Sequence, residues 1–219
     1  MPRLLRRDYA YSADTLAPAL LGCTLVRILP DGTRLVGTIV ETEAYLGPDD
    51  RAAHSFGNRR TARTEPMFGP AGTSYVYFSY GMHWCMNVVA AEPEVPQAVL
   101  LRAIQPTEGL ARIREYRTGS KPRKTPLRDR DLCSGPGKIG QAFALDRAQS
   151  GLDLTQSDRL WLEPAPEPTS SDTVRVSPRI GIDNAGVRAR RHLRYFLCGH
   201  PHVSGRRIPG RPWTSADPG

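Results

Sequence analysis

The sequence has few cysteines and no long apolar run. Its four cysteines, at positions 23, 85, 133 and 198, are widely spaced and form no Cys-x-x-Cys pair, so neither a zinc ribbon nor a dense disulfide framework is indicated. No apolar stretch approaches the roughly 20 residues that cross a bilayer, and residues 1–7 lack the apolar region of a signal peptide. We therefore expect a reducing, intracellular compartment.

Several common catalytic and phosphate-binding motifs are also missing. No Gly-x-Ser-x-Gly nucleophile elbow occurs. The run Ser134-Gly-Pro-Gly-Lys138 lacks parts of a Walker A loop, and we interpret it as a helix N-terminus able to hold one phosphate. His83 and Cys85 alternate on an expected strand, but no further ligands stand at metal spacing. The sequence therefore predicts no metal site.

Lysine is scarce, yet the chain is strongly basic. Thirty Lys and Arg stand against 22 Asp and Glu, which gives a net charge of +8, and lysine occurs only at positions 121, 124 and 138. A basic protein favours a polyanionic partner, because neutralising phosphates releases condensed counterions; a basic protein without such a partner is the alternative. Residues 112–130 hold eight basic and two acidic side chains, which is typical of a phosphate-contacting loop or of a solvated, mobile one.

Length and patterning predict one α+β domain over residues 1–204 and a flexible tail over 205–219. With 219 residues, 39% of them hydrophobic, the chain can bury a substantial core. The spacing of apolar residues predicts strands and helices that do not alternate regularly, which favours α+β. The expected strands cover residues 24–29, 34–46, 75–79, 84–90, 99–104, 159–162 and 193–197. Helices are expected over residues 12–22, 107–117 and 137–145, and a long loop over 47–72.

The segment 37–47 carries two carboxylates on an otherwise apolar strand. Side chains of a strand alternate between its faces, so Ile39, Glu41, Glu43 and Tyr45 are expected on one face and residues 40, 42, 44 and 46 on the other. Such a face is unsuited to a simple core and suggests chemistry. The alternative is an edge strand whose glutamates are solvated.

The segment 75–87 is rich in tyrosine. Tyr75 and Tyr77 are expected to share a face, and Tyr80 stands beside Gly81, where we predict a turn. An aromatic side chain at a turn tip is exposed and can act as a wedge, and aromatic rings near a basic surface suit base stacking, worth about 1–3 kcal/mol per base. An ordinary aromatic core would explain Tyr75 well and Tyr80 poorly.

Arg102 interrupts the apolar run 99–104. A buried guanidinium needs a partner, and Glu41 or Glu43 on a neighbouring strand would serve. A carboxylate paired with arginine stays ionised at neutral pH, as a general base requires. The alternative is a purely structural salt bridge.

Ordered motifs over residues 12–204 resemble the 3-methyladenine (alkyladenine) DNA glycosylase family. They are Glu41-Thr-Glu-Ala-Tyr-Leu-Gly, Asp50-Arg-Ala-Ala-His-Ser, Met67-Phe, Gly72-Thr-Ser-Tyr-Val-Tyr-Phe-Ser-Tyr-Gly-Met-His-Trp-Cys-Met-Asn, Val99-Leu-Leu-Arg-Ala and Leu132-Cys-Ser-Gly-Pro-Gly-Lys-Ile. The resemblance implies a single mixed domain around a curved antiparallel sheet with flanking helices. It also implies a monofunctional enzyme that flips alkylated or deaminated purines out of duplex DNA, hydrolyses the N-glycosidic bond and so initiates base excision repair.

By the same resemblance, Glu43 activates the attacking water and Arg102 helps to hold that water and the glutamate. Tyr45 would contact one face of the extruded base, and His54 with Tyr77 the other. The remaining implied roles are filling of the duplex gap by Tyr80, exclusion of the guanine 2-amino group by Asn87, a backbone carbonyl on the water from Val203, and DNA backbone contacts by Arg59, Arg60, Arg63 and Lys138. Thr64, Ser79 and His83 depart from the family pattern.

The resemblance further implies no cofactor and no metal, a monomer without an obligate protein partner or a membrane, and damaged double-stranded DNA as the partner. The expected location is the nucleoid in a bacterial cytoplasm or the nucleus of a eukaryote. 3-Methyladenine, 7-methylguanine, ethenoadenine and hypoxanthine all remain open as substrates. Two rival readings also remain: a glycosylase/lyase that uses the amine of Pro2 as a Schiff-base nucleophile, and a nucleic-acid-binding module without catalysis.

Overall fold

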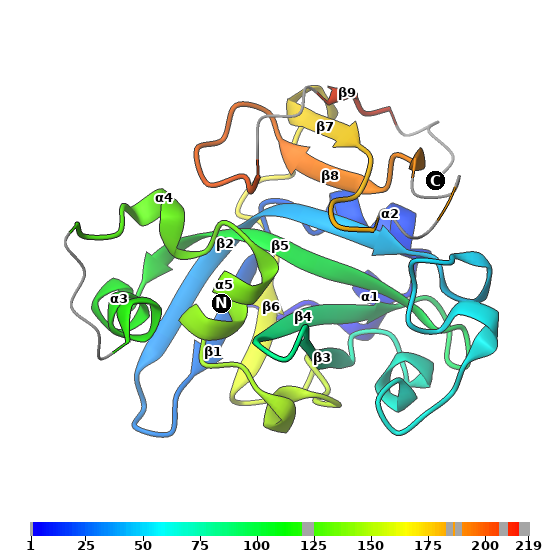
Figure 1. Ribbon diagram of the computed structural model, residues 1–219, viewed down its shortest axis with the longest axis horizontal. Coiled ribbons are helices and arrows are strands. Elements are labelled where there is room, and N and C mark those ends of the chain that lie inside the picture. The colour runs from blue at the N-terminus through cyan, green and yellow to red at the C-terminus, as the bar shows by residue number, and fades with distance from the viewer. Residues whose placement is uncertain (1, 120–124, 183–185, 187–189, 206–209, 215–219) are drawn as a thin grey trace.

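A single curved antiparallel sheet dominates the computed structural model, which describes residues 2–119, 125–182, 186, 190–205 and 210–214 (Figure 1). Within these residues the strand order is β3-β4-β5-β2-β8-β7-β9, and β1 pairs with both β2 and β6. The predicted α+β class is confirmed. The strands are β1 (Thr24–Ile28), β2 (Arg34–Tyr45), β3 (Ser74–Ser79), β4 (His83–Ala90), β5 (Gln97–Glu108), β6 (Leu160–Glu163), β7 (Val174–Ser177), β8 (Arg194–Leu197) and β9 (Arg211–Pro212).

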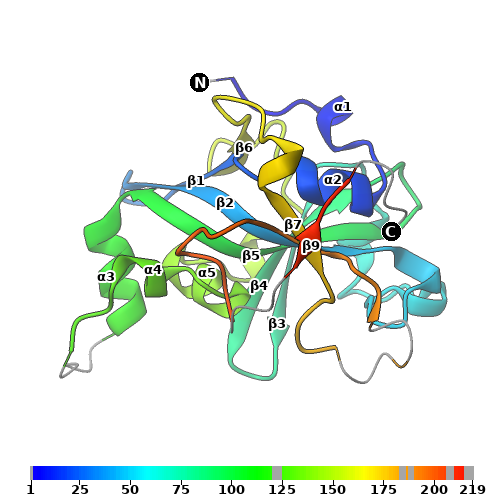
Figure 2. The same ribbon diagram turned by 90° about the horizontal axis from the view of Figure 1, so that it is seen from above.

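Short helices cover the sheet on two sides. Figure 2 shows α1 and α2 on one side of the sheet, and α3, α4, α5 and the projecting β3–β4 hairpin on the other. The helices are α1 (Arg6–Tyr9), α2 (Ala13–Ala19), α3 (Leu110–Thr118), α4 (Asp129–Leu132) and α5 (Pro136–Ala142). The expected long loop contains three short 3-10 turns, η1 (Gly47–Asp49), η2 (Phe56–Asn58) and η3 (Glu65–Phe68), and two more follow at η4 (Arg147–Gln149) and η5 (Ser171–Thr173). None of the described helices is long and apolar enough to cross a membrane.

The strand that carries the two glutamates lies in the middle of the sheet. β2 pairs with β5 on one side, and with β1 and then β8 on the other. Glu41 and Glu43 are fully buried. The alternative of an edge strand with solvated glutamates is therefore wrong, and these carboxylates need partners inside the protein.

A bulge in the β2–β5 pairing changes which side chains share a face. The register passes from Ile39 opposite Ile104 to Glu41 opposite Ala103, with irregularities on both sides of Glu41. A bulge adds a residue to one strand and so resets the alternation of its side chains. Ile39 packs in the main hydrophobic core, away from the ionic partners of Glu41. The expected common face of Ile39 and Glu41 is thus wrong.

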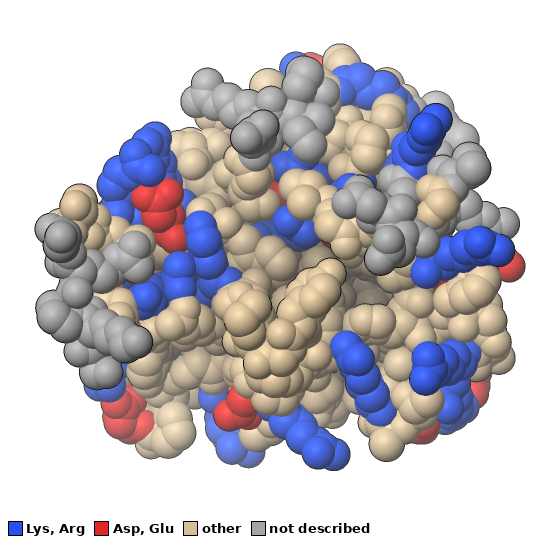
Figure 3. All heavy atoms as spheres, viewed as in Figure 1, with Lys and Arg blue, Asp and Glu red and all other residues tan. Residues whose placement is uncertain are grey.

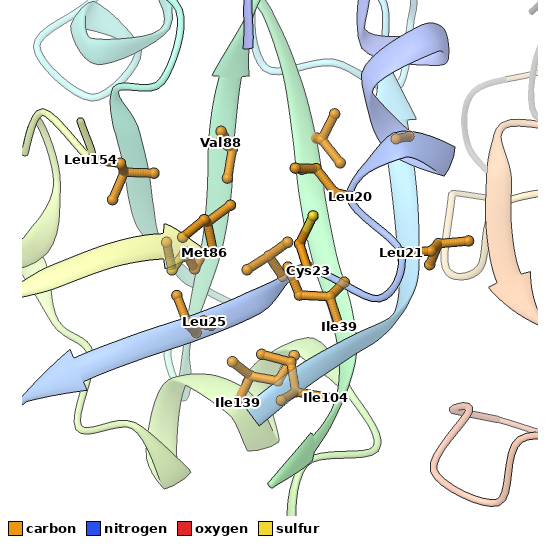
Figure 4. Close-up of a cluster of buried hydrophobic side chains, with 14 of the residues drawn as sticks. Leu20, Leu21, Cys23, Leu25, Ile39, Met86, Val88, Ile104, Ile139 and Leu154 are labelled. Atoms are coloured by element: carbon orange, nitrogen blue, oxygen red, sulfur yellow. The ribbon is translucent and has the colours of Figure 1, made fainter. Parts of the chain in front are cut away.

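The core fixes the strands that carry the cavity described below. Figure 4 shows Leu25 of β1, Ile39 of β2, Ile104 of β5 and Ile139 of α5 converging with neighbouring apolar side chains. Burying each such side chain contributes about 1.5–3 kcal/mol. Because a Cβ on Gly140 would lie 2.0 Å from the Trp84 carbonyl oxygen, α5 packs against β4 only with glycine at this position.

The C-terminal part of the sheet differs from the expectation. β7 was not predicted, because its four residues follow a stretch rich in Pro and Ser that hides the short alternation of Val174 and Val176. Residues 211–212, expected in a flexible tail, pair with β7 as β9, and Trp213 packs against the core. Residues 206–209 and 215–219 lie outside the described residues.

Candidate active site

One cavity brings together most of the residues singled out in the sequence. Its volume is about 880 Å³, which is large enough for a base-sized ring together with part of the backbone to which that ring is attached. Side chains from β2, β3, β4, β5 and the loop after β2 meet in its lining, which includes Tyr45, His54, Tyr77, Asn87 and Arg102. Residues far apart in the sequence thus form a single concave wall.

Glu43 lies directly behind this wall. Its Oε2 accepts a hydrogen bond from the Tyr45 hydroxyl at 2.9 Å, and its Oε1 accepts one from the Ile180 amide at 2.8 Å. Arg102 places a guanidinium nitrogen 3.3 Å from the same Oε1. Tyr45, Arg102 and Ile180 all line the cavity, so one layer of atoms separates the buried carboxylate from a bound ligand.

Burial dominates the titration of Glu43. Desolvation raises its pKa above the ordinary value, while the Arg102 charge, the Ile180 amide and the Tyr45 hydroxyl oppose that rise. The pairing with arginine was expected to favour the ionised form; the Arg102 charge acts in that direction, but complete burial outweighs this one ion pair and the pKa is raised. A carboxylate with a raised pKa is a stronger base than a solvated one, which suits proton transfer near neutral pH.

The predicted partner of Arg102 is confirmed, and the pair is part of a larger buried network. Arg102 donates from Nε to Glu41 Oε1 at 3.1 Å. Arg194 of β8 donates from its Nε to the same oxygen at 2.6 Å, and Ser204 donates to Glu41 from its amide at 2.5 Å and from its hydroxyl at 2.9 Å. Sequence reasoning missed Arg194 and Ser204, because they stand in short segments without a recognisable pattern.

A second buried ion pair supports Tyr45 from behind. The Arg179 guanidinium carbon lies 4.6 Å from the Tyr45 ring centroid, which is cation–π geometry. Arg179 donates to both carboxylate oxygens of Asp50, at 2.5 and 2.8 Å, and to the Ala44 carbonyl at 2.8 Å. Burial raises the pKa of Asp50, but these bonds and two backbone amides outweigh it and leave the pKa lowered. Neither member of this pair was predicted to have a role.

His54 and Tyr77 also line the cavity. Their ring centroids are 4.5 Å apart in an edge-to-face arrangement, and His54 Nδ1 lies 2.9 Å from the Tyr75 hydroxyl. Burial, followed by the nearby Arg63 charge, lowers the pKa of His54 to about 4. The imidazole is therefore neutral at physiological pH and offers one donor and one acceptor.

Asn87 and Tyr80 occupy contrasting positions. Asn87 is buried, lines the cavity and donates from Nδ2 to the Tyr75 carbonyl at 3.0 Å. Tyr80 is 84% exposed at the tip of the β3–β4 hairpin, with a φ of 50°, and Met82 beside it is 69% exposed. The predicted turn is confirmed, and Figure 2 shows the hairpin projecting from the sheet.

The basic residues expected on DNA lie in different environments. Arg63 and Lys138 line the cavity. Arg60 pairs with Glu65 at 2.7 Å and with Glu94 at 2.6 Å, and Arg59 is exposed. Figure 3 shows Lys and Arg atoms spread around a hollow in this face, with few acidic atoms between them.

Much of the basic segment 112–130 is paired within the protein. Arg112 contacts Asp31 at 2.9 Å and Arg128 contacts Asp131 at 2.7 Å, and Arg114 pairs with Asp129. Lys121, Arg123 and Lys124 lie outside the described residues. The segment begins inside α3 and includes the start of α4, so much of it is ordered rather than loop.

Val203 does not lie with the other predicted residues. It lines a second cavity, which borders the loop after β8, and its amide donates to the His200 carbonyl at 3.2 Å. The Ile180 amide, which donates to Glu43 at 2.8 Å, is a backbone contact that the sequence did not predict. The sequence did not point to Ile180, because the segment around Arg179 and Ile180 contains no recognisable motif. Across the described part of the chain, no group of three or more His, Cys, Asp or Glu is arranged to hold a metal ion.

Comparisons with known proteins agree with this geometry. A model of the family described as methylpurine-DNA glycosylase (MPG) matches residues 7–201. Proteins named DNA-3-methyladenine glycosylase are 49% identical in Mus musculus over 88% of this chain and 48% identical in Homo sapiens over 93% of it. The chain spans 58% of the mouse protein and 68% of the human one. A Bacillus cereus (strain G9842) protein named putative 3-methyladenine DNA glycosylase is 45% identical over 89% of this chain and 96% of its own length.

Proposed function

Because the chain belongs to the methylpurine-DNA glycosylase family, we propose that it is a monofunctional DNA glycosylase of base excision repair. It binds damaged duplex DNA, turns an alkylated or deaminated purine out of the stack, and hydrolyses the bond between the base and C1′. The observation that carries this proposal is the buried carboxylate of Glu43 behind a cavity lined with aromatic rings.

The cavity supports recognition of a flat, electron-poor base. Tyr45, His54 and Tyr77 all line it. A cationic alkylated purine gains most from stacking on π-systems. Rotating a base out of the duplex costs a few kcal/mol, and insertion of the exposed Tyr80 ring offsets part of that cost. Asn87, fixed by its bond to the Tyr75 carbonyl, restricts the space for a guanine 2-amino group.

Glu43 is the general base in this proposal. It accepts a proton from water as the water oxygen attacks C1′ and the bonding electrons leave with the purine. Arg102 and the backbone at Ile180 border both the cavity and the carboxylate, and they orient the water. Each carboxylate oxygen accepts one of the two hydrogen bonds in the structure and keeps a further lone pair that can accept the proton of a water.

The nature of the base decides whether a proton donor is also needed. A cationic purine leaves as a neutral molecule, so a single base catalyst suffices. Hypoxanthine and ethenoadenine leave as anions unless they are protonated. His54, neutral at physiological pH, lines the cavity and is the described side chain best placed to donate or relay such a hydrogen bond.

Mass spectrometry of free bases tests the activity directly. The protein is incubated with methylated, ethenoadenine-containing and inosine-containing duplexes, and released bases are identified. We expect a free purine from at least one duplex and no covalent adduct when borohydride is added to reactions on abasic DNA. Release of no base from any duplex would contradict the proposal, and an adduct through Pro2 would replace water by an amine nucleophile.

A further inference from the structure

Glu41 lies at the centre of a buried hydrogen-bond network. Two arginines and both donors of Ser204 bind its carboxylate, at distances from 2.5 to 3.1 Å. Glu41 is fully buried and does not line the cavity. Among its hydrogen-bond partners only Arg102 lines the cavity, so any effect of Glu41 on the reaction passes through that arginine.

Arg102 is the partner that connects Glu41 to the reacting groups. Its Nε donates to Glu41 at 3.1 Å, while a terminal nitrogen lies 3.3 Å from Glu43. A guanidinium is planar, and its donors are fixed relative to one another. A shift of Arg102 toward one carboxylate therefore weakens its contact with the other.

The charged and titratable groups around Glu43 come from several elements. Glu41 and Tyr45 belong to β2, and Arg102 to β5. Tyr77 of β3 and Arg179, which follows β7, also interact electrostatically with Glu43. Arg194 of β8 lies opposite Glu43 in the sheet register but gives its Nε to Glu41. Glu41 and Glu43 are thus balanced by Arg102 and Arg194, while the charge of Arg179 is balanced by Asp50.

We propose that Glu41 is a positioning residue that shares Arg102 with Glu43 and thereby sets the strength of Glu43 as the general base. The proposal rests on the proposed function. Because Arg102 also binds Glu41, it neutralises Glu43 less than it would if it bound Glu43 alone. The Glu43 carboxylate is therefore more basic. Arg194 and Ser204 in turn hold Glu41 in place, so the loop after β8 supports the reacting groups without touching the base.

Removing the negative charge at position 41 has two effects of the same sign. Glu41 raises the pKa of Glu43, while Arg102 lowers it. In Glu41→Gln the repulsion disappears and Arg102 becomes free to pair fully with Glu43, so the pKa of Glu43 falls. A carboxylate of lower pKa is ionised in more acidic solution but is a weaker base.

Single-turnover base release, measured from pH 4 to pH 9 on a duplex from which wild-type protein releases a purine, tests this sharing. For Glu41→Gln we expect the acidic limb of the rate profile to move about one pH unit lower and the plateau rate to fall by up to about tenfold. Lesion binding should change less than about twofold. Glu163→Gln is the matched control, because Glu163 is a buried strand glutamate near Arg34 outside the cavity, and its profile should match wild type.

A second variant keeps the test decisive if Glu41→Gln fails to fold. Ser204→Ala removes the 2.9 Å hydrogen bond to Glu41 and the long, 3.5 Å bond that Arg102 donates to the same hydroxyl, and it keeps every charge. Glu41 then attracts Arg102 more strongly, so Arg102 neutralises Glu43 less and the pKa of Glu43 rises. The acidic limb should move a few tenths of a pH unit higher, opposite to the shift in Glu41→Gln. A folded Glu41→Gln whose limb stays in place or rises overturns the proposal, as does a Ser204→Ala limb that falls or does not move.

The outcome is separable from the proposed function. If wild-type protein releases no base, the proposed function fails before Glu41 is tested. If wild-type protein releases a base and the two variants do not move the limb in opposite directions on that duplex, only the role of Glu41 is contradicted.

Discussion

The floor and the rim of the cavity differ in how their side chains are held: those at the floor are buried and paired, and those at the rim are exposed. At the floor, Glu41 and Glu43 are fully buried and both are paired with the buried Arg102. At the rim, Tyr80 and Met82 are the most exposed large apolar side chains described. Catalysis requires groups fixed before the substrate arrives, whereas insertion into a duplex requires side chains free to leave water for the base stack. Substitutions in the two regions should therefore fail in different ways.

Asp50→Asn is expected to have the largest effect on stability. It leaves the buried Arg179 guanidinium without a charged partner, and breaking a buried pair costs about 3–5 kcal/mol. The free energy of unfolding in urea measures this loss. Asp158→Asn is the control, because the Asp158 side chain is 90% exposed, and its effect should stay within about 0.5 kcal/mol. Equal free energies of unfolding of the two variants would contradict a stabilising role of the buried Asp50–Arg179 pair.

His54 should make stability depend on pH. Its pKa falls from an ordinary 6.5 to about 4 in the folded protein, so between these values the unfolded chain binds more protons. Stability from this group is present above about pH 6.5 and is lost as the pH falls toward 4, by about 1–3 kcal/mol after allowance for partial exposure. Urea unfolding at pH 7 and pH 4.5 measures the loss, and His54→Gln should reduce it. An unchanged pH dependence in that variant would contradict a neutral, buried imidazole.

At the rim, Tyr80→Ala should impair DNA engagement without affecting the fold. Loss of one stacked ring weakens lesion binding by about 1–3 kcal/mol, while unfolding stability stays within about 0.5 kcal/mol of wild type. Fluorescence anisotropy with a lesion-containing duplex measures the binding. Tyr11→Ala is the control, since Tyr11 is another exposed tyrosine outside the cavity lining. Equal affinities of the two variants for the duplex would contradict a contact between Tyr80 and the DNA.

The smallest effect concerns the arginines beside the rim. Arg59 is exposed, and no ion pair to it is found among the described residues; Arg60 already binds two glutamates. Arg59→Ala should reduce the slope of log affinity against log salt by about one, and Arg60→Ala by less. A larger change in the Arg60 variant would show that its ion pairs open on DNA.

Local patterns in the sequence predicted the parts of the molecule that depend on local rules. Alternation and turn residues gave β2 and the Tyr80–Gly81 turn, and the cost of a buried guanidinium gave the pairing of Arg102. The bulge beside Glu41 was not predictable, because it depends on the register between β2 and β5. Asp50 and Arg179 are 129 residues apart in the sequence, so only the folded chain brings them together.

The backbone contact to Glu43 shows the same limit. The Ile180 amide donates to the carboxylate, and nothing in the sequence pointed to this contact; the predicted role of the Val203 carbonyl is a separate contact with water. A backbone group leaves no signature in residue identity, since every residue carries it. Likewise, the direction of the pKa shift of Glu43 depends on complete burial, which the sequence expresses only through the whole fold.

The role of Glu43 is tested most directly by Glu43→Gln, measured beside wild type and Glu163→Gln for both lesion binding and single-turnover base release. We expect the Glu43 variant to bind the lesion as wild type does and to release base at least about 100-fold more slowly, with Glu163→Gln unaffected in both assays. Base release by Glu43→Gln at the wild-type rate would contradict the assignment of this carboxylate as the base that activates water.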